Sequence, residues 1–313
     1  VDPLEVSREL LPLDLPVSIR TTVHGHGNTK TATRRVGLEL DGQRLPDRTL
    51  SVSVPPGGEA AVEFSLRLPV AGSHHLAVVL DEDSLPADDR GERVVTAVDA
   101  LPVLLVDGAP NPDVTRSETF FARAALSAAA NRQPWIAGRV VSWDRLRITD
   151  FPTSGVIVLA NVARPDPAWQ RALVEFVSSG GGLLVTLGDR TDPAAWSEWG
   201  AATELLPVRI DDDPQTAPAS GTVRADGESL AGSWLARFGS DRQGGFTEAG
   251  FTGWWSLEPV DGSEPPRIAA RLDNGRPLLV TSRKGRGHLA AWASTLDADW
   301  NTLPARPDYV SFL

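Results

Sequence analysis

The chain has 313 residues, 41% of them apolar, and a net charge of −11 at pH 7. This length corresponds to about two domains. The acidic balance argues against nucleic-acid binding, because phosphate neutralisation needs a basic surface. Cysteine is absent, which excludes disulfides, thiolate metal sites and a thiol nucleophile. Methionine is also absent and the chain starts at Val1, so we expect a segment of a longer protein. The sequence contains no run of about 18 apolar residues that would span a membrane.

Residues 1–99 are predicted to form a β-sandwich. Short stretches alternate between apolar and polar residues, and Gly, Pro, Asn and Asp turns separate them: Val17–Val23, Val36–Leu40, Leu50–Val54, Ala60–Leu68, His75–Leu80 and Val94–Val98. Alternation places one face of each strand in the core. Strands of this length and spacing are typical of an Ig-like sandwich.

Residues 100–313 are predicted to form an α/β domain with a mainly parallel, flavodoxin-like sheet. Leu101–Gly108, Gly155–Asn161 and Leu183–Leu187 are continuous apolar runs, as expected for strands buried on both faces. Helices are predicted between them. The first helix would start at a capping box in Thr115–Glu118. The second would start at Asp166-Pro167 and end at the three glycines 180–182.

The C-terminal third is less regular. A short helix is predicted from Asp192, residues 205–270 follow no period, and a β-hairpin is predicted from Pro277–Ser282 and His288–Ser294.

Several motifs, taken in order, resemble one family of proteins. They are Leu38–Gly42, Ala71–Leu76, Asp81–Asp89, Leu104–Gly108, Phe176–Val185, Arg276–Val280, Gly285–His288 and Thr295–Pro304. The series resembles a CARDB-type Ig-like domain followed by the class I glutamine-amidotransferase-like domain of bacterial Bat-type membrane proteins. Such proteins often carry a von Willebrand factor A module and flanking transmembrane helices. The resemblance implies an extracytoplasmic location, periplasmic or at the cell surface, with membrane anchoring through segments outside this chain. We also expect protein partners in a membrane complex and no cofactor.

Amidotransferase chemistry is excluded by the residue types. In the resembling folds the nucleophile lies on a sharp turn after a central strand, which corresponds here to Leu187–Arg190. A glutaminase needs an activated thiolate, and this turn has no cysteine, serine or threonine. We therefore expect no enzyme activity.

The carboxyl ends of the predicted parallel strands hold the candidate pocket. Ligands of open α/β sheets bind at that edge, where the polar residues are Asp107, Asn111, Arg116, Asn161, Asp189 and Arg190. The alternative is that the Asp and Asn residues cap turns and helices, which these residue types do well. Both interpretations stay open at the level of sequence.

Three tryptophans are candidates for an interaction surface. Trp234, Trp254 and Trp255 lie in the irregular region among polar, glycine and proline residues, and tryptophan is enriched at interface hot spots. The alternative is that these rings fill the flank of the sheet.

We predict no metal site. His24, His26, His74 and His75 could meet in the first domain, but turn and strand positions explain them, and Asp81, Glu82, Asp83, Asp88 and Asp89 match no calcium-loop spacing. We therefore predict a non-catalytic protein-interaction module. The alternative function is a degenerate enzyme-like domain that binds or hydrolyses a small molecule such as a carbohydrate.

Overall fold

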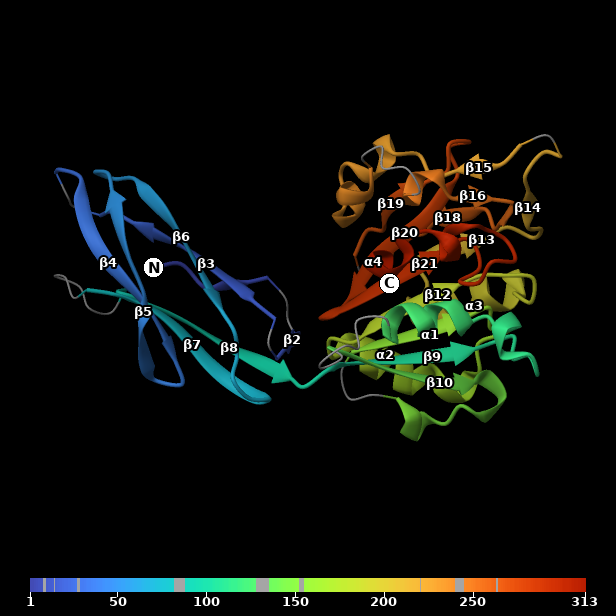
Figure 1. Cartoon of the computed structure of the whole chain (residues 1–313), viewed down its shortest axis with the longest axis horizontal. Coiled ribbons are helices and arrows are strands. Elements are labelled where there is room, and N and C mark those ends of the chain that lie inside the picture. The colour runs from blue at the N-terminus through green and yellow to red at the C-terminus, as the bar shows by residue number, and fades with distance from the viewer. Residues whose placement is uncertain are drawn as a thin grey trace. The chain divides into compact units, whose positions relative to one another are not determined.

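The computed structural model describes residues 1–7, 10–13, 15–26, 29–81, 88–127, 135–151, 155–219, 221–239, 245–262 and 264–313. The chain divides into two compact units, Val1–Leu101 (unit 1) and Pro102–Leu313 (unit 2), and Figure 1 shows that unit 1 is built of strands while unit 2 mixes strands and helices. The sequence placed the boundary between residues 99 and 100. None of the helices in the described ranges combines the length and apolar character that a membrane crossing requires.

Unit 1 consists of two β-sheets. One has the order β1-β3-β6, and the other has the order β2-β8-β7-β4-β5, with only the β2–β8 pair parallel. The strands are β1 (Glu5–Val6), β2 (Leu10–Pro12), β3 (Val17–His24), β4 (Ala32–Leu40), β5 (Gln43–Val54), β6 (Glu59–Leu66), β7 (Gly72–Leu80) and β8 (Arg90–Val98). The six predicted strands are all present, and β1 and β2, which are only two and three residues long, had no pattern to reveal them.

The two sheets of unit 1 bury a common core. Along β3, every second residue from Val17 to Val23 is buried, and β6 buries Val62 and Phe64 in the same alternating way. The apolar side chains among them belong to one cluster with residues of β4 and β7 from the second sheet, such as Leu38 and Leu76. Unit 1 is therefore a β-sandwich, as the alternation predicted.

Unit 2 is organised around a seven-stranded sheet of order β10-β9-β11-β12-β21-β20-β19. The strands are β9 (Leu101–Asp107), β10 (Ile136–Ser142), β11 (Val156–Ala160), β12 (Gly182–Thr186), β19 (Arg267–Arg271), β20 (Pro277–Lys284) and β21 (Gly287–Trp292). The pairs β9–β11, β11–β12 and β12–β21 are parallel. This confirms that the three apolar runs form neighbouring parallel strands of one sheet.

Helices cover the two faces of this sheet. On one face, α1 (Phe120–Ser127) packs Ala122 and Leu126 against residues of β9 and β11. On the other face, α2 (Gln170–Ser178) buries Leu173, Phe176 and Val177 in the main core. Two further α-helices among the described residues are α3 (Pro193–Thr203) and α4 (Tyr309–Phe312).

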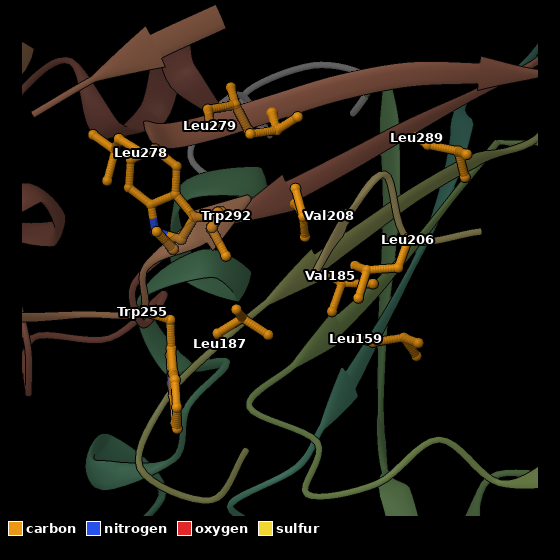
Figure 2. Close-up of a cluster of buried hydrophobic side chains, with 14 of the residues drawn as sticks. Leu159, Val185, Leu187, Leu206, Val208, Trp255, Leu278, Leu279, Leu289 and Trp292 are labelled. Carbon is orange, nitrogen blue, oxygen red and sulfur yellow. The ribbon is translucent and has the colours of Figure 1, made fainter. Parts of the chain in front are cut away.

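The irregular region contributes to the same core. Among its described residues, three pairs of short strands form two-stranded ladders: β13 (Val208–Ile210) with β18 (Leu257–Pro259), β14 (Gln215–Thr216) with β17 (Gly253–Trp254), and β15 (Val223–Arg224) with β16 (Gly250–Phe251). Figure 2 shows Val208 and Trp255 of this region with side chains of the main sheet such as Val185, Leu289 and Trp292. The predicted hairpin is present as β20–β21, and β21 also extends the parallel sheet.

The predicted capping box at Thr115–Glu118 is wrong. Asp113 caps a 3-10 turn at Val114–Arg116 by accepting a hydrogen bond from the Thr115 amide, and α1 begins only at Phe120. Glu118 lies outside the helix and is buried. By contrast, Asp166 and Asp192 cap the segments that follow them, as expected.

Candidate functional site

The carboxyl ends of β9, β11 and β12 meet at one edge of the unit 2 sheet. Ala160, the last residue of β11, is paired with Asp107 on β9 and with Thr186 on β12. Asn161 and the turn that contains Asp189 follow directly. The strand order therefore brings Asp107, Asn161 and Asp189 to the same edge, as the sequence predicted.

Asp107, the last residue of β9, is hydrogen-bonded to Thr119, the residue directly before α1. The Asp107 side chain is buried and accepts hydrogen bonds from the Ala109 amide at 3.0 Å and from the Thr119 hydroxyl at 2.8 Å. Both carboxylate oxygens are thus used within the fold. This contact pattern is that of a structural cap.

Asn161 lies at the centre of a group of polar side chains at these strand ends. The group also includes Asp107, Asp189 and Glu118 and is here called the strand-end group. The Asn161 backbone has φ of 49°, a left-handed conformation that asparagine tolerates better than most residues. Its Nδ2 donates to Asp189 Oδ1 at 2.8 Å and to Glu118 Oε2 at 3.1 Å, and its Oδ1 accepts from the Arg190 amide at 3.1 Å. One amide side chain therefore joins three separate segments.

Two glycines allow Asn161 to occupy this position. A Cβ atom on Gly108 would lie 2.1 Å from the Asn161 carbonyl oxygen, and one on Gly188 would lie 2.5 Å from Asn161 Cγ. Neither position admits a larger residue without displacing Asn161. The turn at residues 187–191 is packed here against an asparagine.

The other predicted pocket residues lie differently. Asp189 and Arg190 are exposed. Asn111 Oδ1 accepts a hydrogen bond from the Asp113 amide, and Arg116 is exposed at the end of the 3-10 turn. Within the described ranges, no hydrogen bond or ion pair connects Asn111 or Arg116 to Asn161. Asn111 and the 3-10 turn form local hydrogen bonds of their own, and the prediction that all six residues line one pocket stays a prediction.

Glu118 completes the group and was missed as a site residue. It is 1% exposed, and its Oε1 accepts from the Leu296 amide at 2.7 Å while its Oε2 accepts from Asn161. Burial, followed by the nearby charges of Asp297 and Asp107, raises the pKa of Glu118 to about 8. The Leu296 and Asn161 hydrogen bonds act in the opposite direction, since they stabilise the ionised form.

Two further buried titratable residues, Asp297 and Tyr309, interact electrostatically with Glu118. Asp297 is buried, accepts from the Asp299 amide at 3.0 Å, and has a pKa that burial raises above its ordinary range. Tyr309 donates its hydroxyl hydrogen to the Leu296 carbonyl at 2.6 Å, and burial raises its pKa as well. The sequence signal for Glu118 was hidden by the apparent capping box, and Asp297 lay in a motif quoted only for the family resemblance.

The hydrogen bonds of this strand-end group hold separate segments of the chain together, and the group is therefore also called a clamp. A carboxyl with a pKa near neutrality suits general acid–base catalysis, but both Glu118 oxygens already accept from fixed donors. The hydroxyl of Thr191, just after the turn, accepts from the Gly188 amide at 3.0 Å. The contacts join β11, the entrance of α1 and the segment around Leu296.

Trp254 and Trp255 are buried, at 4% and 3% exposure, so their prediction as surface interaction residues is wrong. Trp254 lies in the β14–β17 ladder opposite Gln215. The Trp255 indole donates to the Gly188 carbonyl at 2.9 Å, and its ring lies in the core shown in Figure 2. The irregular region therefore uses these rings to close the flank of the sheet.

Trp234 is 56% exposed. It begins a five-residue 3-10 helix whose first turn is capped by the Ser233 hydroxyl. Its ring stacks on Phe312, with ring centroids 6.3 Å apart. Trp234 also borders a hollow of about 500 Å³, here called the sheet-face groove, with half-buried Val156, Leu184 and Ala290 among its lining.

The histidines and acidic residues of unit 1 have other partners. His74 is buried between Asp41 Oδ2 and the Val70 carbonyl oxygen, at 2.7 and 2.8 Å, while His24 contacts Asp2 and His75 contacts Glu92. Glu82 and Asp83 of the acidic cluster lie outside the described residues. In the described part of the chain, no group of three or more His, Asp or Glu side chains is arranged to hold a metal ion.

Comparisons with known proteins return structural likenesses only. No protein-family model and no curated protein matches the chain. A cytoplasmic protein from Salmonella typhimurium aligns with 67% of this chain and 94% of its own, at 18% identity and a TM-score of 0.49. A CARDB domain from Pyrococcus furiosus aligns with 31% of this chain and 84% of its own, at 14% identity and a TM-score of 0.28. An exo-β-1,4-mannosidase from an Opitutaceae bacterium aligns over 68% of this chain and 33% of its own, at 16% identity and a TM-score of 0.40.

Proposed function

We propose that this chain is a non-catalytic, extracytoplasmic interaction module of a membrane-anchored bacterial protein. In this proposal, unit 1 is a CARDB-type Ig-like domain and unit 2 is a class I glutamine-amidotransferase-like domain that has lost the chemistry of its relatives. The module binds a protein partner of a membrane complex. Its order of motifs and its sequence of a β-sandwich followed by a parallel α/β sheet support this assignment.

The non-catalytic part of the proposal is supported by the strand-end group. Asp107 accepts from the Ala109 amide and the Thr119 hydroxyl, while Glu118 accepts from the Leu296 amide and from Asn161, so the carboxylate oxygens of both already have donors. The neighbouring turn lacks a thiol or hydroxyl from Leu187 to Arg190. A nucleophilic mechanism needs an activated nucleophile beside a base, and the clamp leaves neither in place.

One observation carries the interaction role: Trp234 is exposed beside a groove with an apolar floor. A large, rigid aromatic ring beside an unfilled apolar depression is the arrangement found at binding hot spots. The other two tryptophans considered are buried, so the interaction surface is centred on Trp234 alone.

The interaction role is tested in the full-length protein. Affinity-tagged wild type and Trp234→Ala are purified from their native membrane after mild crosslinking, with Trp135→Ala as the control because Trp135 is also exposed, at 37%. We expect Trp234→Ala to lose at least about tenfold of a co-purified protein that Trp135→Ala retains, since a hot-spot residue contributes about 2 kcal/mol or more. Equal recovery by both variants, with unchanged melting temperatures, would contradict the role.

Two further measurements test the remaining parts. A topology reporter fused after Leu313 in the full-length protein should respond as an extracytoplasmic fusion, and a cytoplasmic response would contradict the location. Purified protein should hydrolyse neither glutamine nor a panel of glycosides. Turnover that disappears in Glu118→Gln would instead favour the enzyme-like alternative.

A further inference from the structure

The sheet-face groove lies on the face of the unit 2 sheet that carries α1. Leu184 on β12 is paired with Ala290 on β21. Ala290 is paired in turn with Thr281 on β20, which lies opposite Arg267 on β19. Paired residues of neighbouring strands project from the same face, so these four side chains form one row. The row changes from apolar at the middle of the sheet to cationic at its edge.

A second row lies one step closer to the amino ends of the parallel strands. Val156 is paired with Gly182, Gly182 with His288, and His288 with Arg283. Gly182 carries no side chain and leaves room between Val156 and His288. His288 and Arg283 are exposed, while Val156 is half-buried. This row also changes from apolar to cationic in the direction of β20.

The cationic side of the groove is unusual for this chain. The whole sequence carries a net charge of −11, yet Arg267, Arg283 and His288 line the groove with Glu264 as their single carboxylate neighbour in that lining. Neither arginine side chain has an ion-pair or hydrogen-bond partner among the residues that the structure describes. Their guanidinium groups are thus free to bind an anionic partner.

The other cations of the adjoining hairpin turn are engaged. Lys284 Nζ lies 2.7 Å from Glu204 Oε2, and Arg286 donates to the Ser179 carbonyl at 2.8 Å. The positive charge offered to a partner therefore comes from Arg267 and Arg283, on neighbouring strands.

The floor of the groove favours an apolar contact over a sugar. The Thr281 hydroxyl donates to the Arg267 carbonyl at 3.4 Å, and the Ser282 hydroxyl donates to the Glu264 carbonyl at 3.1 Å. Polar small molecules are oriented by several convergent hydrogen-bonding groups, but these two hydroxyls are already used. Besides the His288 ring and the Glu264 carboxylate, the groove offers a ligand the apolar surface of Leu184 and Ala290, the ring of Trp234, and the two guanidinium groups.

A helix has the size that this surface requires. Parallel sheets normally carry helices on both faces. Each row crosses four neighbouring strands and so spans about 14 Å, at about 4.8 Å between strands. A helix with its side chains is about 10–12 Å wide. A helix laid across them would contact both the apolar and the cationic ends of the rows.

From this arrangement we infer that the sheet-face groove binds an amphipathic helix of the partner protein, with aliphatic side chains on its buried face and Glu or Asp residues toward Arg267 and Arg283. The inference rests on the interaction role proposed above and specifies the chemistry of its partner. Trp234 packs along one flank of the helix. Attraction between the carboxylates and the arginines fixes its orientation and weakens as salt rises.

The test uses three synthetic 18-residue peptides as probes. All have the same Leu/Ala face at helical spacing, and their polar faces carry only Glu, only Lys, or only Gln. Binding to the purified chain is measured by calorimetry, and resonance shifts of the backbone amides locate the site. We expect the Glu peptide to bind at least about tenfold more tightly than the Lys peptide, with the Gln peptide between them, and the preference to shrink at high salt.

Charge reversal provides the decisive comparison. The double variant Arg267→Glu/Arg283→Glu should reverse the preference so that the Lys peptide binds more tightly, and Trp234→Ala should weaken all three peptides. Arg171→Glu is the control, because Arg171 is exposed on α2, which packs against the opposite face of the sheet. Equal affinity of the Glu and Lys peptides, or a charge preference that the double variant retains, overturns the inference.

The two proposals fail separately. If Trp234→Ala releases the native partner but the peptides do not discriminate by charge, the acidic-helix assignment is wrong and the interaction role survives. If Trp234→Ala leaves the native partner bound to the full-length protein, the interaction role itself is wrong.

Discussion

Glu118 makes the stability of unit 2 depend on pH in an unusual direction. Its pKa is raised in the folded protein from the ordinary value of 4.5 to about 8, chiefly by burial. Between pH 4.5 and about pH 8, the folded state therefore keeps a proton that the unfolded state has already released. Its contribution to stability is fully present below about pH 4.5 and is lost as pH rises through about 8.

The magnitude follows from the same two values. At about 1.36 kcal/mol per pKa unit, the complete loss amounts to about 5 kcal/mol between pH 4.5 and pH values above 8, as an upper limit. Glu118→Gln removes the ionisation but keeps the size of the side chain. Its amide group can match only one of the two donors, Leu296 and Asn161, so at pH 5 we expect the variant to be less stable by about 1–3 kcal/mol.

We therefore predict that the difference in unfolding free energy between Glu118→Gln and wild type changes sign as pH rises. Relative to wild type, Glu118→Gln should gain up to about 4 kcal/mol between pH 5 and pH 9, because about 3 of the pKa units of the shift lie in that interval, and become the more stable protein at the upper end. All ten tryptophans lie in unit 2, so urea unfolding followed by tryptophan fluorescence reports on this unit. Glu198→Gln, which removes an exposed carboxyl from α3, is the matched control. An identical stability difference at pH 5 and pH 9 would refute the reasoning.

Three other outcomes are expected. Gly188→Ala should destabilise unit 2 by about 1–3 kcal/mol because the new Cβ would lie 2.5 Å from Asn161 Cγ, whereas Gly232→Ala, with no atom within 4 Å of its Cβ position, should be nearly neutral in the same fluorescence assay. The stability of unit 1, followed by amide exchange, should fall as pH rises from 6 through the raised pKa of His74, since the protonated ring donates to both Asp41 and the Val70 carbonyl. His74→Gln should abolish that pH dependence, and a dependence that persists would assign it to another group. Trp234→Ala should release the native partner of the full-length protein, as measured by the co-purification described above.

The strands of this protein are encoded by short-range patterns. Alternation along Val17–Val23 is enough to indicate a half-buried strand, and the apolar run before Asp107 is enough to indicate a fully buried one. The rule that parallel strands share a carboxyl edge then predicts that Asp107 and Asn161 lie close together. These features were predictable because each depends on neighbours within a few residues, or on a general rule of sheet topology.

The nature of the strand-end group was decided by contacts between distant residues. Glu118 accepts from Leu296, 178 positions along the chain, and nothing in the local sequence distinguishes a buried clamp from a capping box. The burial of Trp254 likewise depends on its pairing with Gln215 in a two-residue ladder, which is too short to leave a period in the sequence. The sequence alone indicated which polar residues lie at the sheet edge and which tryptophans lie in the irregular region. Only long-range packing determined which of them were desolvated, because burial depends on what the rest of the chain places against each side chain.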